Sequence, residues 1–192
     1  MRHAGLVLAA GSGSRFGRPK AEVGYDGRTL LDRAVDACRS AELRPVVVVL
    51  GARIAPRVRL ALPAHVDTVT NTQWRTGMAS SLRTGLLHLT DETDADAAVV
   101  TLVDTPSVGA EHLLRVRRVL DAARPAAVAS YGGAWRTPVA LGRGLWPSVV
   151  ASVSGDRGAG PWLRSHPELV IPVECGDLGP WTDIDTPEDL PR

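Results

Sequence analysis

The segment from Val7 to Tyr25, VLAAGSGSRFGRPKAEVGY, decides how the rest of the chain is interpreted. An apolar run that is typical of a buried strand stops at Gly11 and gives way to glycine, serine and arginine. This loop ends at Lys20, the single lysine among 22 basic residues. A composition this biased toward arginine would be expected to have replaced an arbitrary surface lysine. We therefore expect Lys20 to have a specific role.

The composition limits the class of protein. A chain of 192 residues can bury a substantial core, and we expect one domain over residues 1–192. The formal net charge of +1, with both signs mixed along the chain, gives no general field for nucleic acid or a membrane surface. No apolar run approaches the ~20 residues that span a bilayer. Cys38 and Cys175 lack metal-binding spacing and are expected to be reduced and buried. Because no run is long enough to span a membrane, the protein is expected to be cytoplasmic.

The alternation of apolar patterns predicts the architecture. Apolar runs bounded by turn residues predict buried strands at Ala4–Ala9, Val46–Leu50, Val66–Thr70, Ala97–Val103 and Ala126–Ser130. Helical spacing between them predicts helices at Leu30–Cys38, Ile54–Leu62, Met78–Leu89 and Glu111–Ala123. Repeated strand–helix units predict a mainly parallel α/β sheet with helices on both faces. The less regular remainder predicts a strand at Pro138–Leu141, whose direction stays open, a helix starting near Gly158 and a strand at Val170–Val173.

The loop after the first strand has the residue types of a phosphate-binding site. In doubly wound sheets ligands lie at the carboxyl ends of the strands. Gly11 and Gly13 allow tight turns and close approach of the backbone to a ligand, while Arg15 and Lys20 add positive charge. Two common motifs do not fit. Gly17 lies one residue too far along for GxGxxG, and Lys20 is not followed by the Ser or Thr of a P-loop.

The pattern LAAGxGxRxGxPK, matched without a gap from Leu8 to Lys20, resembles the signature of nucleotidyltransferases of the nucleotide-diphospho-sugar transferase fold. The resemblance implies a three-layer α/β sandwich around a mainly parallel sheet. It also implies that the loop wraps the triphosphate of an NTP, with Arg15 and Lys20 as catalytic groups that neutralise phosphate charge. The nucleotide-binding residues implied in this loop are Leu8, Ala9, Ala10, Gly11, Ser12, Gly13, Ser14, Arg15 and Lys20.

Acidic residues at two places are candidates for a metal site. Asp104 follows the apolar run AAVVTLV, at the sheet edge that also bears the glycine loop, and Mg²⁺ prefers carboxylate oxygens. The resemblance implies that Asp104 is a catalytic metal ligand; a turn cap before Pro106 is the alternative. The segment WTDIDTPEDL, residues 181–190, resembles the closing motif of the same family, where Asp183 aligns best with a second ligand and Asp185 is the competitor. This segment is also a good helix start.

A further segment points to a subfamily. NTQWRTGMASSLRTGL, Asn71–Leu86, resembles the N..W..GM..SL..G segment of the molybdenum cofactor cytidylyltransferases among the MobA-like NTP transferases. This resemblance implies that Ser81 contacts the pyrimidine. The alternative is that Ser80 and Ser81 merely suit the first turn of a helix. Ala10 also favours a pyrimidine, because LAGG in place of LAAG is common among guanylyl-transferring relatives.

The match to this subfamily weakens near the expected acceptor site. SGDRGAG, residues 154–160, and RTPVALGR, residues 136–143, resemble its GDxGAR and GHPV segments. Gly160 stands where arginine is usual, Arg136 and Thr137 stand where Gly-His is usual, and Val103 replaces a glycine. These departures leave nucleotidyl transfer intact and concern the acceptor. Trp135 is either a stacking platform for that acceptor or simply packed.

The sequence therefore predicts an Mg²⁺-dependent enzyme that transfers CMP from CTP to the phosphate of a small acceptor, with molybdopterin as the first candidate. The acceptor phosphate attacks the α-phosphorus in line, pyrophosphate leaves, and no protein nucleophile is required. Use of GTP or UTP, or of a sugar-phosphate acceptor, stays open. So does a non-catalytic nucleotide-binding protein, although a pure binder needs fewer metal ligands than Asp104 and Asp183 provide. A molybdoenzyme or chaperone partner is not identified by the sequence.

Overall fold

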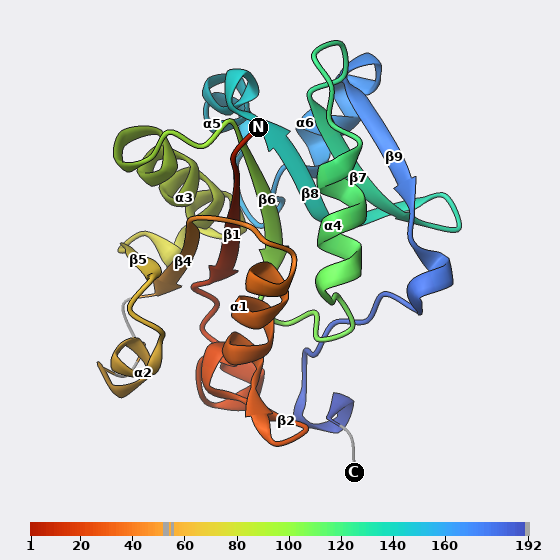
Figure 1. The fold of residues 1–192 in the computed structure, drawn as a ribbon. Helices are drawn as coiled ribbons and strands as arrows, with labels where there is room; N and C mark the ends of the chain where they lie inside the picture. Colours follow the sequence, from red (N-terminus) through yellow and green to blue (C-terminus); the bar gives the residue numbers. More distant parts are fainter. Residues whose placement is uncertain (52–53, 55, 191–192) are drawn as a thin grey trace.

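A seven-stranded sheet forms the centre of the computed structural model, which describes residues 1–51, 54 and 56–190 (Figure 1). The strands of this sheet are β1 His3–Ala9, β4 Val46–Gly51, β5 Val66–Asn71, β6 Ala97–Leu102, β7 Ala126–Tyr131, β8 Ala134–Gly142 and β9 Val170–Glu174. Their order is β5-β4-β1-β6-β8-β7-β9, in which β8 runs antiparallel to both neighbours and the other pairs are parallel. A small hairpin, β2 Gly24–Tyr25 and β3 Arg28–Thr29, lies outside the sheet.

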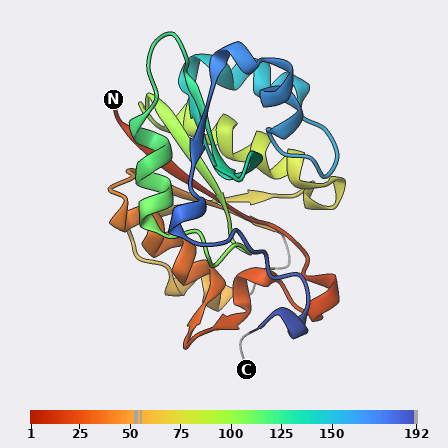
Figure 2. The ribbon, with the colours of Figure 1, turned by 90° about the vertical axis from the view of Figure 1, so that its right-hand side faces the viewer.

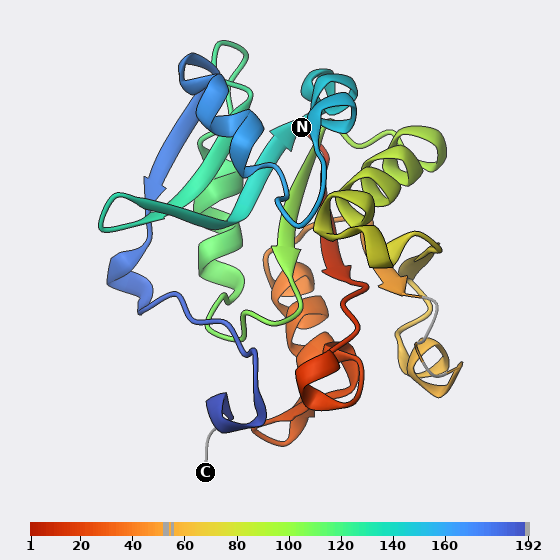
Figure 3. The same cartoon turned by 180° about the vertical axis from the view of Figure 1, so that it is seen from behind.

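Helices cover both faces of the sheet. They are α1 Leu30–Ser40, α2 Pro56–Ala61, α3 Met78–Glu92, α4 Ala110–Arg118, α5 Trp146–Ser152 and α6 Gly160–Ser165. Helices α1 and α4 lie in front of the sheet in Figure 1, and α3, α5 and α6 lie on the opposite face, which Figure 3 shows from behind. Figure 2 shows the sheet between the two helical layers. The predicted three-layer sandwich with a mainly parallel sheet is confirmed.

The alternation of side chains along β1 explains why both faces are covered. Val7 and Ala9 belong to the core beneath α1 and α4, whereas Leu6 and Leu8 belong to the core beneath α3, α5 and α6. All four are buried. A strand that is buried on both faces has a continuous apolar sequence, as parallel strands between helical layers do. The strand that precedes the glycine loop is therefore held in the core on both of its faces.

Several elements differ from the sequence prediction, among them the β2–β3 hairpin, which was not predicted. Helix α4 ends at Arg118 rather than Ala123, because the Asp121 carboxylate accepts hydrogen bonds from the backbone of Ala123 and Arg124 and forms a turn there. Helix α5 was not predicted, since its short sequence lies among glycines and prolines. Strand β8 is longer than Pro138–Leu141 and antiparallel. The predicted helix at 54–62 is observed as α2, with residue 55 outside the described residues.

Two smaller expectations concern the cysteines and membrane segments. Cys38 and Cys175 are free and buried, as predicted. Within the described part of the chain, no helix has the length and apolar character needed to cross a membrane.

Candidate active site

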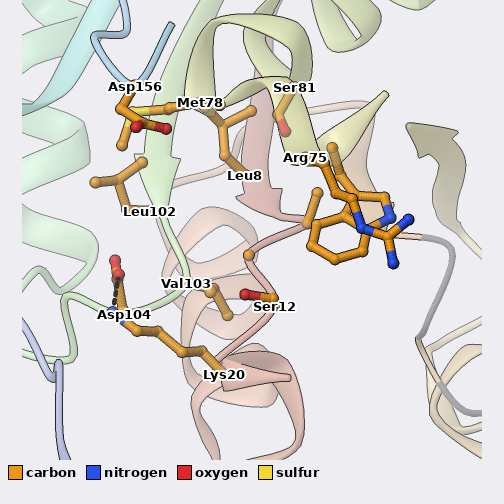
Figure 4. A pocket seen from close by; sticks show the side chains of 14 residues that line it. Leu8, Ser12, Lys20, Arg75, Met78, Ser81, Leu102, Val103, Asp104 and Asp156 are labelled. Atoms are coloured by element: carbon orange, nitrogen blue, oxygen red, sulfur yellow. Dashed lines mark hydrogen bonds and ion pairs between the residues drawn. The ribbon is translucent and has the colours of Figure 1, made fainter. Parts of the chain in front are cut away.

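A cavity of about 420 Å³ opens at the carboxyl ends of β1 and β6 (Figure 4). Parallel sheets bind their ligands at this edge. Of the residues assigned to nucleotide binding from the sequence, those that line the cavity are Leu8, Ala10, Gly11, Ser12, Lys20 and Ser81. Ala9, Gly13, Ser14 and Arg15 are not part of its lining. The structure thus brings the ends of the predicted loop and the predicted serine together around one space.

The glycine loop returns to the sheet through a turn that needs glycine at position 13. Gly13 has φ of +56°, and a Cβ atom there would lie 1.8 Å from the carbonyl oxygen of Arg18. The Gly13 carbonyl accepts a hydrogen bond from the Phe16 N–H at 2.9 Å. This tight folding of the loop leads the chain back so that Lys20 lies at the cavity.

Lys20 links two carboxylates that are far apart in the sequence. Its Nζ atom donates to Asp104 Oδ2 at 2.7 Å and to Asp185 Oδ1 at 2.6 Å. Arg15 donates to the other oxygen of Asp185 at 3.2 Å. The Lys20 and Asp104 side chains are 15% and 22% exposed, while Asp185 is 47% exposed. The cluster therefore lies at the mouth of the cavity, shielded on the Lys20 side and open on the Asp185 side.

The electrostatics of this cluster favour the charged forms of Lys20 and Asp185. Burial alone would lower the pKa of Lys20, but the charges and hydrogen bonds of Asp104 and Asp185 outweigh it and raise that pKa above its ordinary value. The hydrogen bond from Lys20 is the main cause of a lowered pKa at Asp185, which Arg15 also favours. In this cluster Lys20 and Arg15 contact the carboxylates directly, with no water layer between the opposite charges.

The C-terminal segment brings Asp185, rather than Asp183, to Lys20. The N–H of buried Ile184 donates to the carbonyl oxygen of Asp104 at 2.8 Å, which fixes the segment against the end of β6. Asp185 then meets Lys20, while the exposed Asp183 makes no hydrogen bond or ion pair within the described residues. Metal binding by either residue stays a prediction, but only Asp185 shares a cation with Asp104.

Helix capping does not account for the Asp185 side chain. The short turn that begins at Thr186 is capped by Asp189, whose carboxylate accepts from the backbone N–H groups of Asp185 and Thr186. The Asp185 carboxylate itself is engaged with Lys20 and Arg15. The helix-start pattern and the acidic cluster are therefore both present, and different aspartates form them.

Ser81 faces the cavity from the first turn of α3, on the far side from Lys20 (Figure 4). The amide nitrogen of buried Asn71 donates to Ser80 Oγ at 2.8 Å and to Ser81 Oγ at 3.0 Å. Ser80 donates in turn to the Gly77 carbonyl. Among the described residues no acceptor for the Ser81 hydroxyl proton is found, so this O–H can be donated into the cavity.

Sequence reasoning missed several lining residues, of which Arg75 and Asp156 carry charge. The Arg75 guanidinium lies 4.7 Å from the centre of the Trp74 ring, at the turn before α3. Asp156 comes from the loop before α6. That loop approaches closely because Gly77 has no side chain: a Cβ there would lie 2.4 Å from Gly155. Both lie in segments already noted for their resemblance, so the motif could have identified them.

The residues present fit a divalent cation only together with a ligand. Within the described residues, no three His, Cys, Asp or Glu side chains gather into a metal site. Mg²⁺ in nucleotide sites is held by one or two carboxylates plus phosphate oxygens and water. Asp104 and Asp185 already share one cation, the Lys20 ammonium, and supply two carboxylates of the required type. The donor set therefore fits a metal that arrives with a triphosphate.

A family model described as the MobA-like NTP transferase domain matches residues 5–170. The chain belongs to this family. The match spans the glycine loop, Asp104 and Ser81, and it makes the chain a nucleotidyltransferase-type enzyme of the nucleotide-diphospho-sugar transferase fold. Asp185 lies beyond the matched residues, so its place in the site rests on the geometry above.

Three similar proteins illustrate the range of the family. A protein named nicotine blue oxidoreductase from Paenarthrobacter nicotinovorans is 35% identical and covers 98% of this chain and 94% of its own. A molybdenum cofactor guanylyltransferase from Rhodobacter capsulatus is 31% identical and covers 100% and 95%. The Rv0371c protein of Mycobacterium tuberculosis H37Rv has a solved structure with 28% identity, a TM-score of 0.80 and coverage of 98% and 95%. A second solved structure of that protein is a complex with manganese.

Proposed function

We propose that the chain transfers a nucleotidyl group from an NTP, with CTP favoured, to the phosphate of a small organic acceptor. The observation that supports this most is the position of Lys20 Nζ between Asp104 and Asp185 at the cavity that the glycine loop and Ser81 line. An oxygen of the acceptor phosphate forms a bond to the α-phosphorus. The α–β bridging P–O bond breaks, and pyrophosphate leaves with the electron pair. The protein orients the two phosphates and stabilises their charge.

In this proposal Lys20 and Arg15 bind the triphosphate. Both cations lie at the mouth of the cavity and donate hydrogen bonds to Asp185. When a triphosphate binds, its oxygens can replace the Asp185 carboxylate as their acceptors. Asp104 and Asp185 hold the divalent metal, Mg²⁺ by preference for oxygen ligands, with Asp183 as the alternative second ligand. When bound, the metal neutralises charge that develops on the phosphates.

The base is assigned to the side of the cavity formed by Ala10 and Ser81. Ala10 is buried, and its methyl group occupies space that a glycine would leave to a larger base. The free Ser81 O–H is a donor, and N3 of cytosine is an acceptor whereas N3 of uracil carries a proton. These two features favour CTP over GTP and UTP. GTP is the direct competitor because a guanylyltransferase is among the similar proteins.

The acceptor proposed first is molybdopterin, the molybdenum cofactor precursor, in line with the named guanylyltransferase. The test is pyrophosphate release with each of the four NTPs, Mg²⁺ and molybdopterin, comparing the protein with its Asp104→Asn variant. We expect release that needs both substrates, is fastest with CTP and is lost in the variant. Equal release by Asp104→Asn would contradict the assignment of the site.

Oxidoreductase activity is a second candidate, because the relative with 35% identity along nearly the whole chain is named nicotine blue oxidoreductase. The measurement is the absorbance of nicotine blue with NADH or NADPH in the presence of the protein. Turnover that persists in Asp104→Asn, without pyrophosphate release from any NTP, would favour this candidate over nucleotidyl transfer.

We further infer that residues 1–192 act as one domain in the cytoplasm. The site draws on Leu8 near one end of the chain, Asp104 in the middle and Asp185 near the other end, so neither half contains it alone. Two free, buried thiols agree with a reducing compartment.

A further inference from the structure

A second cavity of about 180 Å³ adjoins the one at Lys20. The two share Leu8, Met78 and Leu102 in their walls, so they lie next to one another at the end of β6. The second cavity extends away from the nucleotide loop, between strands β6, β7 and β8 and helices α3 and α6. Its volume lies below the roughly 300–1,000 Å³ of pockets that hold a whole drug-sized ligand. It therefore suits one part of a substrate whose reacting group lies in the first cavity.

The walls of this second cavity are mainly apolar. The sheet contributes Val100, Val128 and Val139, and the helices contribute Leu82 and Leu163, all of them buried. A sugar or a polar heterocycle placed here would give up hydrogen bonds to water and find few replacements. An apolar ring has no hydrogen bonds to water to give up on entering, and it would gain contact with these side chains and with the half-buried Trp135.

The charges at this cavity have one sign. Arg136 on β8 and Arg164 on α6 are its only charged lining residues, and the described residues place no acidic side chain in ion-pair contact with either. The Arg164 guanidinium lies beside Gly160, where a Cβ would be 3.4 Å from its terminal nitrogen. The Arg136 guanidinium lies 5.3 Å from the centre of the Trp181 ring. Both arginines are exposed, and Arg136 donates one hydrogen bond to the Trp135 carbonyl. Two arginines without an acidic partner at the edge of an apolar space are suited to a carboxylate or phosphate group on an apolar body.

We propose that this cavity binds the body of the acceptor, and that the acceptor is an organic phosphate with an apolar ring and a second anionic group. The reacting phosphate lies in the first cavity, the ring in the second, and the anionic group meets Arg136 and Arg164. The role of the reacting phosphate rests on the proposed nucleotidyl transfer. The ring and its anion rest on the second cavity alone. They distinguish this acceptor from a sugar phosphate and from molybdopterin, whose pterin ring is polar, so the proposed nucleotidyl transfer is kept and its first acceptor is replaced.

Binding of three small probes tests the proposal. The probes are 4-carboxyphenyl phosphate, phenyl phosphate and glucose 1-phosphate, titrated by calorimetry into the full chain with Mg²⁺ and CTP. We expect 4-carboxyphenyl phosphate to bind at least tenfold more tightly than glucose 1-phosphate, with phenyl phosphate between them. Arg164→Gln should reduce the affinity for 4-carboxyphenyl phosphate to that of phenyl phosphate, and Arg164→Lys should retain part of it.

The controls separate this cavity from the rest of the site. Arg118→Gln removes the same charge from an exposed position on α4, on the other face of the sheet, and should change nothing. Arg136→Gln repeats the test from the strand if Arg164→Gln fails to fold. Equal affinity for glucose 1-phosphate, or unchanged binding by both glutamine variants, overturns the acceptor class. If CTP binding still depends on Lys20 in that case, nucleotidyl transfer stands; if CTP does not bind but the ring probe does, the cavity stands and the proposed function fails.

Discussion

Replacement of Lys20 by methionine removes the charge at the centre of the cluster and keeps most of the side chain's apolar length. Lys20 Nζ lies 2.7 Å from Asp104 Oδ2 and 2.6 Å from Asp185 Oδ1, so the variant deprives both carboxylates of their shared cation. Loss of one preorganised donor to a transition-state anion costs ~10²–10³ in rate, about 2.7–4 kcal/mol. We expect pyrophosphate release by Lys20→Met to fall by that factor.

The same variant should change metal binding in the opposite direction. In this variant Asp104 and Asp185 face one another without a cation between them, and a divalent metal is no longer repelled by the Lys20 ammonium. Two unit charges 4 Å apart interact by about 4 kcal/mol at an effective dielectric constant of 20. Removal of Lys20 relieves part of the repulsion between its ammonium group and the metal. Because Asp185 is half-exposed, we discount this energy to at least ~1.4 kcal/mol, which corresponds to a tenfold change in metal affinity. We therefore expect Mn²⁺ to bind at least tenfold more tightly to Lys20→Met without nucleotide.

The assays are calorimetry with Mn²⁺ and a coupled pyrophosphate assay. Arg18→Met is the matched control, because Arg18 is an exposed cation of the same loop with no ion pair to the acidic cluster in the described structure. It should change neither measurement by more than about threefold. Turnover of Lys20→Met within threefold of the original protein, or Mn²⁺ affinity that does not rise, would refute the reasoning.

Three further predictions concern the same site. Asp185→Asn should reduce turnover at least tenfold while Asp183→Asn stays within about threefold, because only Asp185 contacts Lys20; equal losses in kinetic assays would contradict this. Ser81→Ala should lower the CTP-to-UTP ratio of kcat/KM by roughly 3–10-fold, about 0.5–1.5 kcal/mol for one hydrogen bond, and an unchanged ratio would remove Ser81 from base recognition. The Lys20–Asp185 pair should stabilise the fold evenly from about pH 5 to 9. The raised pKa of Lys20 means that its contribution is lost only as pH rises through that value, and the lowered pKa of Asp185 means that its contribution is lost as pH falls below about 4. Thermal unfolding of Lys20→Met against the original protein measures this, and a difference that varies between pH 5 and 9 would be inconsistent with it.

Local signals predicted much of the fold. The helix predicted to start at Leu30 does start there, and the structure shows a capping box at Thr29. In it Thr29 Oγ1 accepts from the Asp32 N–H and the Asp32 carboxylate accepts from the Thr29 N–H. Helix α5 escaped prediction because its packing depends on Trp146, whose burial beneath the sheet is a tertiary effect. A helix can be predicted from the sequence when its capping residues and its apolar periodicity both lie within the segment itself, as in α1.

The choice between the two C-terminal aspartates shows where sequence reasoning ends. Asp183 and Asp185 flank Ile184 in an extended segment, so alternation places both on the side opposite the buried isoleucine. Which one reaches Lys20 depends on how far the segment slides along the end of β6. The hydrogen bond from the Ile184 N–H to the Asp104 carbonyl sets that register. It joins residues 80 positions apart, and no local pattern encodes it.

The most direct test of the account is the position of the metal and nucleotide in a crystal of the protein with Mn²⁺ and CTP, located by the anomalous signal of manganese. The account predicts one manganese within roughly 2.0–2.6 Å of carboxylate oxygens of Asp104 and Asp185, with the triphosphate on the Gly11–Lys20 loop and the base beside Ser81. Manganese and CTP bound elsewhere, such as in the cavity between α1 and the start of α4, would contradict it.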